Sequence, residues 1–431
     1  MQSFLISTTV KGIKGLSKPV TIRFVKNKSV KNVFDTTDRV RAIYGPNGCG
    51  KSSFIYGNYL ALRFLIYKDF IPTMGDYYLN QLLNRKDPIF TYSCDFAVSA
   101  EEEDTKYYRY GFEINGVDPS NQYVSYERFQ RIHYKENRLE TIFETREGNV
   151  VTIKLSHYDS ATIIQKSLNV VRTQSLLPIL LRMAKEQNFS FQKEEDLKAL
   201  LRFAASTSVF LQYTDLHPNL LPNALPYISL EGVPTISNNV ENSEAIEMRG
   251  GYVMVPKSGF GIFEKAIKSK SEFIKLFKQN LKGIVIDKKD YGEKYACRLI
   301  MDYGDFSIEQ SFESSGIKRL INLYDAVARI AEGYTVFIDE IDTGISGVYL
   351  SKLIDYVNQY TKGQLCFTAH TLDPMFVLAD KSKSIYFMDG DGKTTPWTKN
   401  SHYMPYKLYP EGMIGNITFN IEPEDFISIF H

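Results

Sequence analysis

Residues 45 to 53 read Gly45-Pro46-Asn47-Gly48-Cys49-Gly50-Lys51-Ser52-Ser53. This stretch fits the pattern G-x-x-x-x-G-K-[ST], which is typical of a phosphate-binding loop (P-loop). Its glycines let consecutive backbone N–H groups converge on an anion, because no Cβ atom stands in the way. Lys51 is then placed to reach the β- and γ-phosphates, and the Ser52 hydroxyl is placed to bind Mg²⁺. We therefore expect all nine residues to contribute to a nucleotide site.

The flanks of the P-loop have the order that such a site requires. Arg41-Ala-Ile-Tyr44 favours a β-strand, and residues 53–63 carry apolar residues at helical spacing. A bound phosphate would lie at a helix N-terminus, where the helix dipole and free N–H groups favour an anion. A glycine-rich turn that matched by chance would lack this order of strand, loop and helix.

The composition is that of a globular protein large enough for two or three lobes. The chain has 431 residues, of which 43% are hydrophobic and 23% charged. No run approaches the roughly 18 apolar residues of a membrane span. Its four cysteines are scattered singly, which argues against a disulfide framework or a zinc site and favours a cytoplasmic location. A net charge of +1 predicts no global attraction to nucleic acid, so any DNA contact would need a local patch.

The first 160 residues are dominated by alternating patterns that predict antiparallel strands. Residues 3–10 and 19–24 indicate a hairpin ahead of the P-loop strand. The acidic run 101–104 is expected to be a solvated hairpin tip. Further strands are expected over 89–98, 106–114, 124–129, 140–144 and 150–154.

The middle of the chain has a different character. Residues 162–186, with a kink expected at Pro178, and 194–206 have helical spacing, whereas 214–260 favours long connections with one short strand at 227–230. Residues 261–281 predict a basic amphipathic helix or helix pair, and strands are expected after it at 284–287 and 295–302. The lysines of this helical stretch are best interpreted as a solvated face, and contact with nucleic acid is the alternative. No heptad array long enough for a coiled-coil arm is present.

An apolar strand ending in two carboxylates follows in the last third of the chain. Tyr334-Thr-Val-Phe-Ile-Asp339-Glu340 has the form of a buried parallel strand whose C-terminal tip enters a nucleotide site. Asp339 would hold Mg²⁺ through water, and Glu340 would polarise the water that attacks the γ-phosphate. By itself this run would also fit a strand that ends in a solvated acidic turn. Its combination with Lys51 and Ser52 favours the catalytic interpretation.

The order of the remaining motifs resembles that of the ABC-type ATPases. Ser311-Phe-Glu-Ser-Ser-Gly-Ile-Lys-Arg-Leu320 precedes a helix and then the acidic strand, and Gln364-Leu-Cys-Phe-Thr-Ala-His370 follows that strand. The resemblance implies ATP as the nucleotide and a homo-oligomer with composite sites. Ser315 and Gly316 of one subunit would clamp the γ-phosphate bound by another, and His370 would contact that phosphate. A lone histidine at a strand end would ordinarily be structural. The place of His370 after the acidic strand favours instead the role of the switch histidine, which contacts the γ-phosphate.

Within this group, residues 313–320 and 108–112 look more like the OLD, RecF and SMC branch than like transporter subunits. The chain most resembles the OLD-like "ATP/GTP phosphatase" ATPases of bacterial anti-phage (abortive infection) systems, such as the ATPase subunit of PARIS. It departs from these relatives at Ser346, where they carry Asp or His. Gln81 is the one weak candidate for the glutamine that such ATPases carry in their Q-loop. The stretch after His370 is shorter than the roughly hundred residues of the TOPRIM nuclease domain that OLD nucleases append. Asp389-Gly-Asp391-Gly392 could form a metal site, but a hairpin turn is the favoured interpretation.

These patterns and the resemblance predict an α/β fold, with an ABC-type head made of a mixed sheet core and an antiparallel β lobe. Three regions are expected: an N-lobe over 1–160, an α-rich insertion over 161–283 and a C-lobe over 284–431. The resemblance implies a nucleotide-gated sensor or scaffold ATPase. It would control a separate effector, for which a TOPRIM nuclease is one candidate, and would respond to a phage-derived trigger. The alternatives are a RecF- or SMC-like DNA-repair ATPase acting directly on DNA, and a nuclease with an unrecognised metal site.

Overall fold

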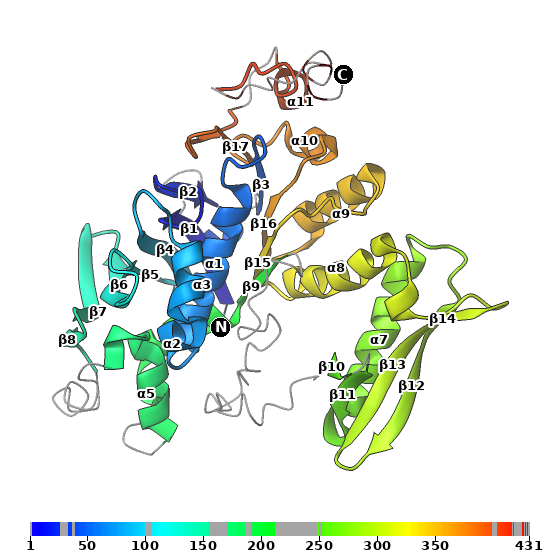
Figure 1. Cartoon of the computed structure of the whole chain (residues 1–431), viewed down its shortest axis with the longest axis horizontal. Helices are drawn as coiled ribbons and strands as arrows, with labels where there is room; N and C mark the ends of the chain where they lie inside the picture. Colours follow the sequence, from blue (N-terminus) through cyan, green and yellow to red (C-terminus); the bar gives the residue numbers. More distant parts are fainter. Residues whose placement is uncertain are drawn as a thin grey trace.

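The computed structural model describes residues 2–25, 33–36, 39–99, 105–155, 170–185, 191–211, 248–249, 252–398, 403–415, 417, 425, 427 and 429. Within this part of the chain, no helix is both long and apolar enough to cross a lipid bilayer. Figure 1 shows an antiparallel sheet on one side, a central sheet beside the helix that follows the P-loop, and a smaller sheet with two long helices on the other side.

The central sheet has six strands in the order β18-β17-β3-β16-β15-β9. Every pair in it is parallel except β17 with β18. All residues of β3, β15, β16 and β17 are buried, as expected for parallel strands that are covered on both faces. The strands are β3 (Val40–Tyr44), β9 (Thr207–Phe210), β15 (Thr335–Ile338), β16 (Gln364–Thr368), β17 (Ile385–Met388) and β18 (Thr394–Pro396).

A seven-stranded antiparallel sheet forms the predicted N-terminal lobe, in the order β2-β1-β4-β5-β6-β7-β8. The expected N-terminal hairpin is present, because β1 pairs with β2. The predicted tip at 101–104 lies outside the described residues. The strands are β1 (Gln2–Lys11), β2 (Val20–Arg23), β4 (Ile89–Ser99), β5 (Thr105–Asn115), β6 (Tyr123–His133), β7 (Arg138–Arg146) and β8 (Asn149–Ile153).

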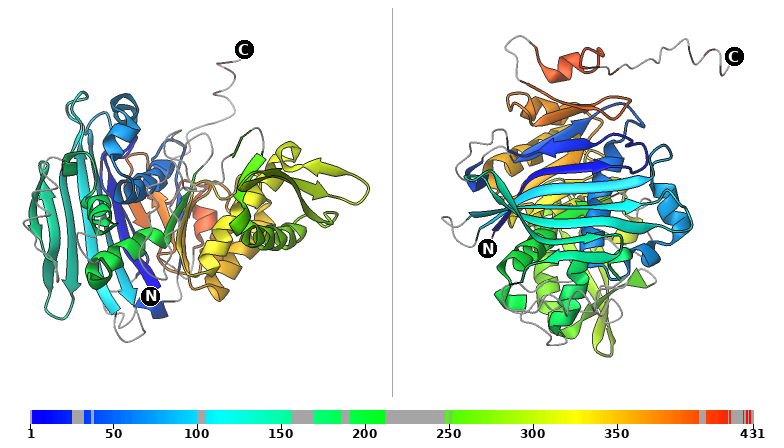
Figure 2. Two further views of the ribbon diagram at one scale, coloured as in Figure 1. Left: turned by 90° about the horizontal axis from the view of Figure 1, so that it is seen from below. Right: turned by 90° about the vertical axis from the view of Figure 1, so that its left-hand side faces the viewer.

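Helix α1 (Lys51–Ile66) lies between these two sheets (Figure 2). One core cluster joins its side chains to the antiparallel sheet and to one face of the central sheet. The opposite face of the central sheet is covered by α8 (Ser315–Ala331), α9 (Gly347–Tyr360) and α10 (Asp373–Leu378). The P-loop, which begins where β3 ends, is therefore supported from both sides. This arrangement confirms the predicted α/β class, with a mixed sheet core and an antiparallel β lobe.

A third, five-stranded sheet packs with α7 (Phe260–Lys275) and α8. Helix α7 confirms the amphipathic helix predicted over 261–281, and β12 and β13 confirm the strands predicted after it. The sequence patterns did not indicate β10 or β11. The strands are β10 (Met248–Arg249), β11 (Tyr252–Pro256), β12 (Gly283–Tyr291), β13 (Lys294–Asp302) and β14 (Ser307–Glu309).

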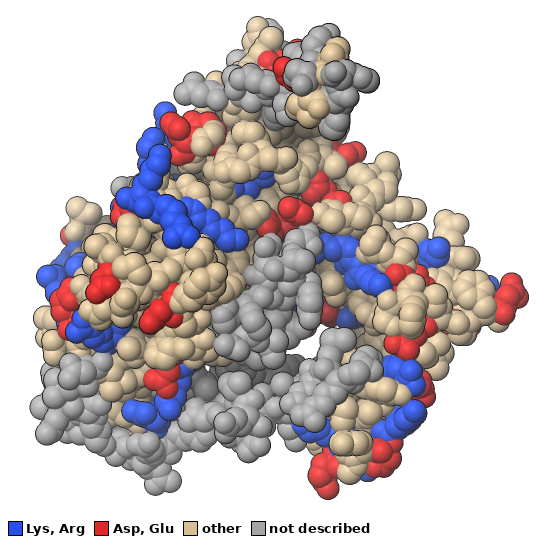
Figure 3. All heavy atoms as spheres, viewed as in Figure 1, with Lys and Arg blue, Asp and Glu red and all other residues tan. Residues whose placement is uncertain are grey.

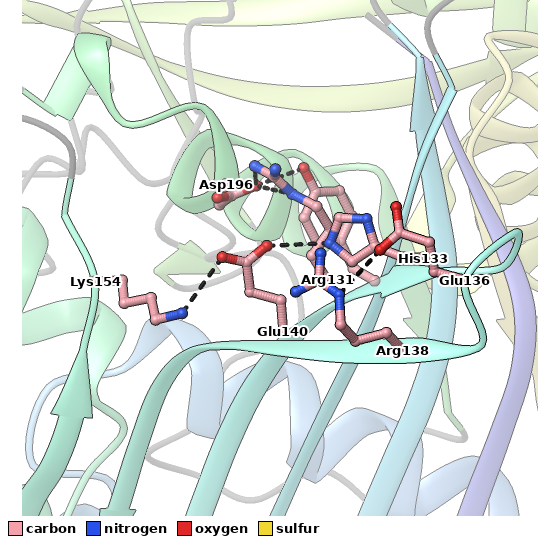
Figure 4. Close-up of polar contacts among 8 residues, drawn as sticks. Arg131, His133, Glu136, Arg138, Glu140, Lys154 and Asp196 are labelled. Atoms are coloured by element: carbon pink, nitrogen blue, oxygen red, sulfur yellow. Dashed lines mark hydrogen bonds and ion pairs between the residues drawn. The ribbon is translucent and has the colours of Figure 1, made fainter.

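The region 161–283 does not pack as one separate α-rich insertion. Strand β9 is an edge strand of the central sheet, paired with β15. Helix α6 (Glu195–Ala205) is tied to the antiparallel sheet, because Asp196 Oδ1 accepts hydrogen bonds from Arg131 Nη2 at 2.5 Å and from the Tyr108 hydroxyl at 2.9 Å (Figure 4). The N-lobe therefore continues past residue 160. Of the described elements in this region, β10 and β11 are strands of the third sheet and α7 packs with it. These pairings join segments far apart in sequence, which local periodicity cannot reveal.

The kink expected at Pro178 is also wrong. Helix α5 (Leu176–Lys185) begins only two residues before this proline. A proline in the first turn breaks no helical hydrogen bond, since the N–H groups there have no partner within the helix. The short strand expected at 227–230 lies outside the described residues.

A buried carboxylate, Glu127 of β6, fixes the start of α5. It accepts hydrogen bonds from the Tyr110 hydroxyl at 2.7 Å, the Ser175 hydroxyl at 2.5 Å and the N–H of Leu176 at 2.9 Å. Burial nevertheless raises the pKa of Glu127 to about 7. Because this folded-state pKa lies above the unfolded value, the stabilisation is complete at low pH and is lost as the pH rises through about 7.

We expect the free energy of unfolding of the wild type to fall by about 2–3 kcal/mol between pH 5 and pH 8 through this group. Glu127→Gln keeps the shape and removes the ionisation, so its stability should change less with pH. Urea unfolding of both proteins at several pH values measures the difference. Parallel pH profiles for the two proteins would contradict this assignment.

Candidate nucleotide site

The P-loop connects β3 to α1 in a conformation that needs its glycines. Gly48 and Gly50 have φ angles of 79° and 109°, in the left-handed region that favours glycine. A Cβ atom on Gly45 would lie 2.3 Å from the carbonyl oxygen of Met388, the last residue of β17. The close packing of this loop on the neighbouring strand therefore excludes a side chain at position 45.

Lys51 spans the P-loop from the first residue of α1. Its ammonium group donates hydrogen bonds to the carbonyl oxygens of Gly45 at 2.7 Å and Pro46 at 3.0 Å. Burial lowers the pKa of Lys51, while the nearby Cys49 and carboxylates, among them Asp339, act in the opposite direction. The first turn of α1 contains no acidic residue, so the positive end of the helix dipole is not neutralised there. The arrangement suits an anion.

A cavity of about 490 Å³ opens at the P-loop and joins it to the two predicted catalytic side chains. Glu340 and His370, from the ends of two adjacent parallel strands, face the loop across this space. The lining residues are Asn47, Gly48, Gly50, Lys51, Ser52, Ser53, Glu340 and His370.

Asp339 lies deeper than the cavity wall and is 1% exposed. Its Oδ1 accepts a hydrogen bond from the Thr368 hydroxyl at 2.5 Å, and the Thr368 oxygen in turn accepts the N–H of Glu340 at 2.7 Å. Thr368, at the end of β16, thus joins both acidic residues to the neighbouring strand. The sequence analysis missed it, although it lies two residues before His370.

The donor set near the P-loop fits Mg²⁺, which takes oxygen ligands and usually keeps several waters. Ser52 supplies a hydroxyl that lines the cavity, and Asp339 supplies a carboxylate behind it. Within the described residues, no cluster of three or more His, Cys, Asp or Glu side chains could form an all-protein metal site. A magnesium ion here would depend on phosphate oxygens and water as further ligands.

Glu340 is held in an unusual backbone conformation with a φ of 47°. Its Oε2 accepts a hydrogen bond from the Thr343 hydroxyl at 3.2 Å, and its Oε1 lies 3.9 Å from His370 Nε2. Both side chains are partly exposed toward the cavity. The Glu340 side chain therefore lines the same cavity as the P-loop.

His370 is positioned by Asp342, another residue that the sequence analysis did not single out as a site residue. The Asp342 Oδ2 accepts the backbone N–H groups of His370 at 2.7 Å and Thr371 at 2.6 Å. The carboxylate therefore fixes the turn after β16. A signal was present in the sequence, because Asp342 follows the acidic strand closely, but its partners could not be identified without the sheet.

The signature residues, Ser315 and Gly316, which were predicted to clamp the γ-phosphate bound by another subunit, lie away from this cavity. Ser314 caps α8 by accepting the N–H of Ile317 at 3.4 Å, and Ser315 is the exposed first residue of that helix. Neither Ser315 nor Gly316 lines the cavity at the P-loop of their own chain. Gly316 instead packs against the loop after the acidic strand, since a Cβ atom on it would lie 2.8 Å from the carbonyl oxygen of Gly344.

The model of one protein family, described as an AAA domain, matches residues 9–319, a span that includes the P-loop and the signature residues. The chain belongs to the AAA domain family. No curated protein matches it.

Among solved structures, the SMC head bound to the C-winged helix domain of ScpA is 14% identical, with a TM-score of 0.44, and the match covers 92% of this chain and 98% of that one. The SMC head domain from Thermotoga maritima is 14% identical, with a TM-score of 0.34, and covers 92% and 99%. The ATP complex of the recombination mediator RecF is 11% identical, with a TM-score of 0.38, and covers 92% and 99%.

Two other candidate residues of this AAA domain protein take no part in the cavity. Gln81 of α3 (Asp76–Leu82) does not line it, and its Oε1 accepts a hydrogen bond from Arg85 at 2.6 Å on the surface. Asp389 Oδ1 accepts the N–H groups of Asp391 at 3.1 Å and Lys393 at 2.9 Å, which closes the hairpin between β17 and β18. The turn interpretation of this segment is confirmed.

Proposed function

We propose that this protein is an ATPase whose hydrolytic site is the cavity at the P-loop. The observation that carries the proposal is that one cavity brings together Lys51, Glu340 and His370 from three separate parts of the chain. Phosphoryl transfer needs mainly positioning and electrostatic stabilisation, and this cavity offers backbone N–H groups, a buried cation and a carboxylate.

Each residue then has a distinct task. Lys51 neutralises charge on the β- and γ-phosphates, while Glu340 orients the attacking water and accepts its proton. His370, held through its backbone by Asp342, contacts the γ-phosphate next to that water. Ser52 and Asp339 would hold Mg²⁺, which neutralises negative charge as the terminal phosphate leaves.

We further propose that the active unit is a homo-oligomer in which Ser315 and Gly316 complete the site of another copy. Both residues lie away from the cavity of their own chain. Phe312, three residues before Ser315, is 75% exposed, and Val348 at the start of α9 is 68% exposed. An exposed apolar surface beside a helix N-terminus suits association with a second copy that carries bound nucleotide.

The cellular role that we propose is control of a separate effector in anti-phage defence, and it rests on the family resemblance of residues 1–154 and 262–390. A DNA-repair ATPase that acts directly on DNA is the second candidate. One observation favours it: Figure 3 shows adjacent lysine and arginine side chains gathered at the upper left of the face that it draws. Such a patch could contact phosphates locally despite the net charge of +1.

A single assay separates these functions. The purified protein is incubated with DNA and Mg²⁺, with and without ATP, and hydrolysis, DNA binding and DNA cleavage are all measured. We expect ATP hydrolysis that DNA does not stimulate, and no cleavage. Stimulation by DNA, with binding that weakens steeply as salt is raised, would favour the repair ATPase. Cleavage that is lost in Asp389→Ala or Asp391→Ala would contradict both and would indicate a nuclease.

A further inference from the structure

Arg319 of helix α8 reaches from the signature region to the acidic strand of its own chain. It lies one helical turn after Ser315, so the same end of α8 carries both the exposed serine and this arginine. Its Nη2 donates hydrogen bonds to the carbonyl oxygens of Asp339 at 2.9 Å and Glu340 at 2.8 Å. The guanidinium group therefore holds the backbone, not the side chain, of the proposed catalytic glutamate.

The backbone at Glu340 depends on such support. A non-glycine residue seldom adopts a positive φ, and Glu340 has a φ of 47°. Neighbouring groups fix this conformation from three directions. The Thr368 hydroxyl oxygen accepts the N–H of Glu340 at 2.7 Å. The carbonyl oxygen of Glu340 accepts hydrogen bonds from Arg319 and from the N–H of Thr343, the latter at 3.2 Å. The Thr343 hydroxyl donates to the Glu340 side chain. Of these three residues, Arg319 is the one that belongs to helix α8, which also carries Ser315.

The surroundings of Arg319 argue that it is more than a surface cation. Burial lowers the pKa of Arg319, and the carboxylates of Asp339, Glu340 and Asp342 act against that effect. Its Nε has no hydrogen-bond partner within the described part of the chain. Desolvating a guanidinium group costs free energy, and the two hydrogen bonds to the acidic strand offset this cost. A second link lies nearby, since Gly316 packs closely against Gly344 in the loop that follows Glu340.

We propose that Arg319 is a positioning residue, which holds Glu340 in the orientation needed to activate water and makes that orientation depend on helix α8. The inference rests on the proposed function, in which the N-terminus of α8 contacts nucleotide held by another copy. Each copy's glutamate then responds to the nucleotide in the neighbouring site, because the helix that contacts this nucleotide also holds the glutamate. Arg319 does not line the cavity at the P-loop, so it acts through Glu340.

The test compares Arg319→Ala, Arg319→Lys and the matched control Arg329→Ala. Arg329 lies on the same helix but donates to the Ser208 hydroxyl at 2.8 Å in β9, away from the cavity. We expect Arg319→Ala to lower kcat for ATP about 10- to 100-fold, as a misplaced catalytic group does, and to leave KM unchanged because the P-loop still holds the nucleotide. Arg319→Lys should recover part of the loss, since an ammonium group can donate to both carbonyl oxygens. Arg329→Ala should keep the wild-type kcat.

The outcomes separate this inference from the proposed function. If the wild type does not hydrolyse ATP, both fall. If the wild type is active and a folded Arg319→Ala protein keeps its kcat, or loses ATP affinity instead, the positioning role is overturned and the ATPase assignment stands. If Arg319→Ala fails to fold, as thermal unfolding will show, Arg319→Lys and Arg319→Gln take its place. A loss of kcat at constant KM in the folded glutamine variant supports the proposal. A wild-type kcat in that variant overturns it.

Discussion

Lys51→Ala is expected to abolish ATP binding, whereas Glu340→Gln is expected to bind ATP and fail to hydrolyse it. The buried ammonium of Lys51 lies within the P-loop, 2.7 Å from the carbonyl oxygen of Gly45, and is the cation placed to meet the β- and γ-phosphates. Glutamine keeps the shape of Glu340 but cannot accept a proton from water, so turnover should fall about 100- to 10,000-fold. Fluorescent-nucleotide binding and phosphate release measure the two effects separately.

Matched controls come from exposed residues that do not line the cavity. Lys68 follows α1 and pairs with Asp69 on the surface, and Glu332 is the C-cap of α8, so Lys68→Ala and Glu332→Gln should leave binding and turnover unchanged. An equal loss of ATP affinity in Lys51→Ala and Glu340→Gln would contradict the division of roles, because it would mean that Glu340 serves binding and not catalysis.

A substitution at Ser315 should inactivate hydrolysis without touching the P-loop of its own chain. Ser315 is exposed at the N-terminus of α8, so Ser315→Arg is expected to leave the fold and ATP binding intact. A bulky cation there would block the approach of the second copy's nucleotide. Gly316→Asp is a poorer probe, because a Cβ atom at 316 would lie 2.8 Å from the Gly344 carbonyl oxygen and would disturb the loop after Glu340.

Mixing two inactive variants gives the sharper result. In a dimer of one Lys51→Ala chain and one Ser315→Arg chain, both lesions fall in the same composite site and the other site is intact. Activity should therefore reappear on mixing, up to about a quarter of the wild-type rate if the chains pair at random. No recovery from two folded proteins, or full activity in a strictly monomeric wild type, would show that each chain forms a complete site alone.

The P-loop could be recognised from nine consecutive residues because its conformation and its ligands are local. Gly48 and Gly50 adopt the left-handed angles that the pattern requires, and Lys51 begins the predicted helix. Strand β15 could also be predicted from the sequence. In a chain that contains a P-loop, an apolar run that ends in two carboxylates favours a strand that leads into the nucleotide site. The hairpin at Asp389 was also predicted correctly, because Asp-Gly turn chemistry acts within four residues.

The sequence by itself therefore determined the nucleotide-binding loop, the α/β class and the order of the motifs, all of which depend on short-range propensity and periodicity. Only the tertiary structure decided which side chains support the site. Strand β9 joins the central sheet across a long stretch of chain, Thr368 and Asp342 find their partners on adjacent strands, and Arg319 reaches the acidic strand from another element. Parallel pairing and buried hydrogen bonds join residues that no local pattern relates, since they form only when distant segments pack and must satisfy each other's polar groups.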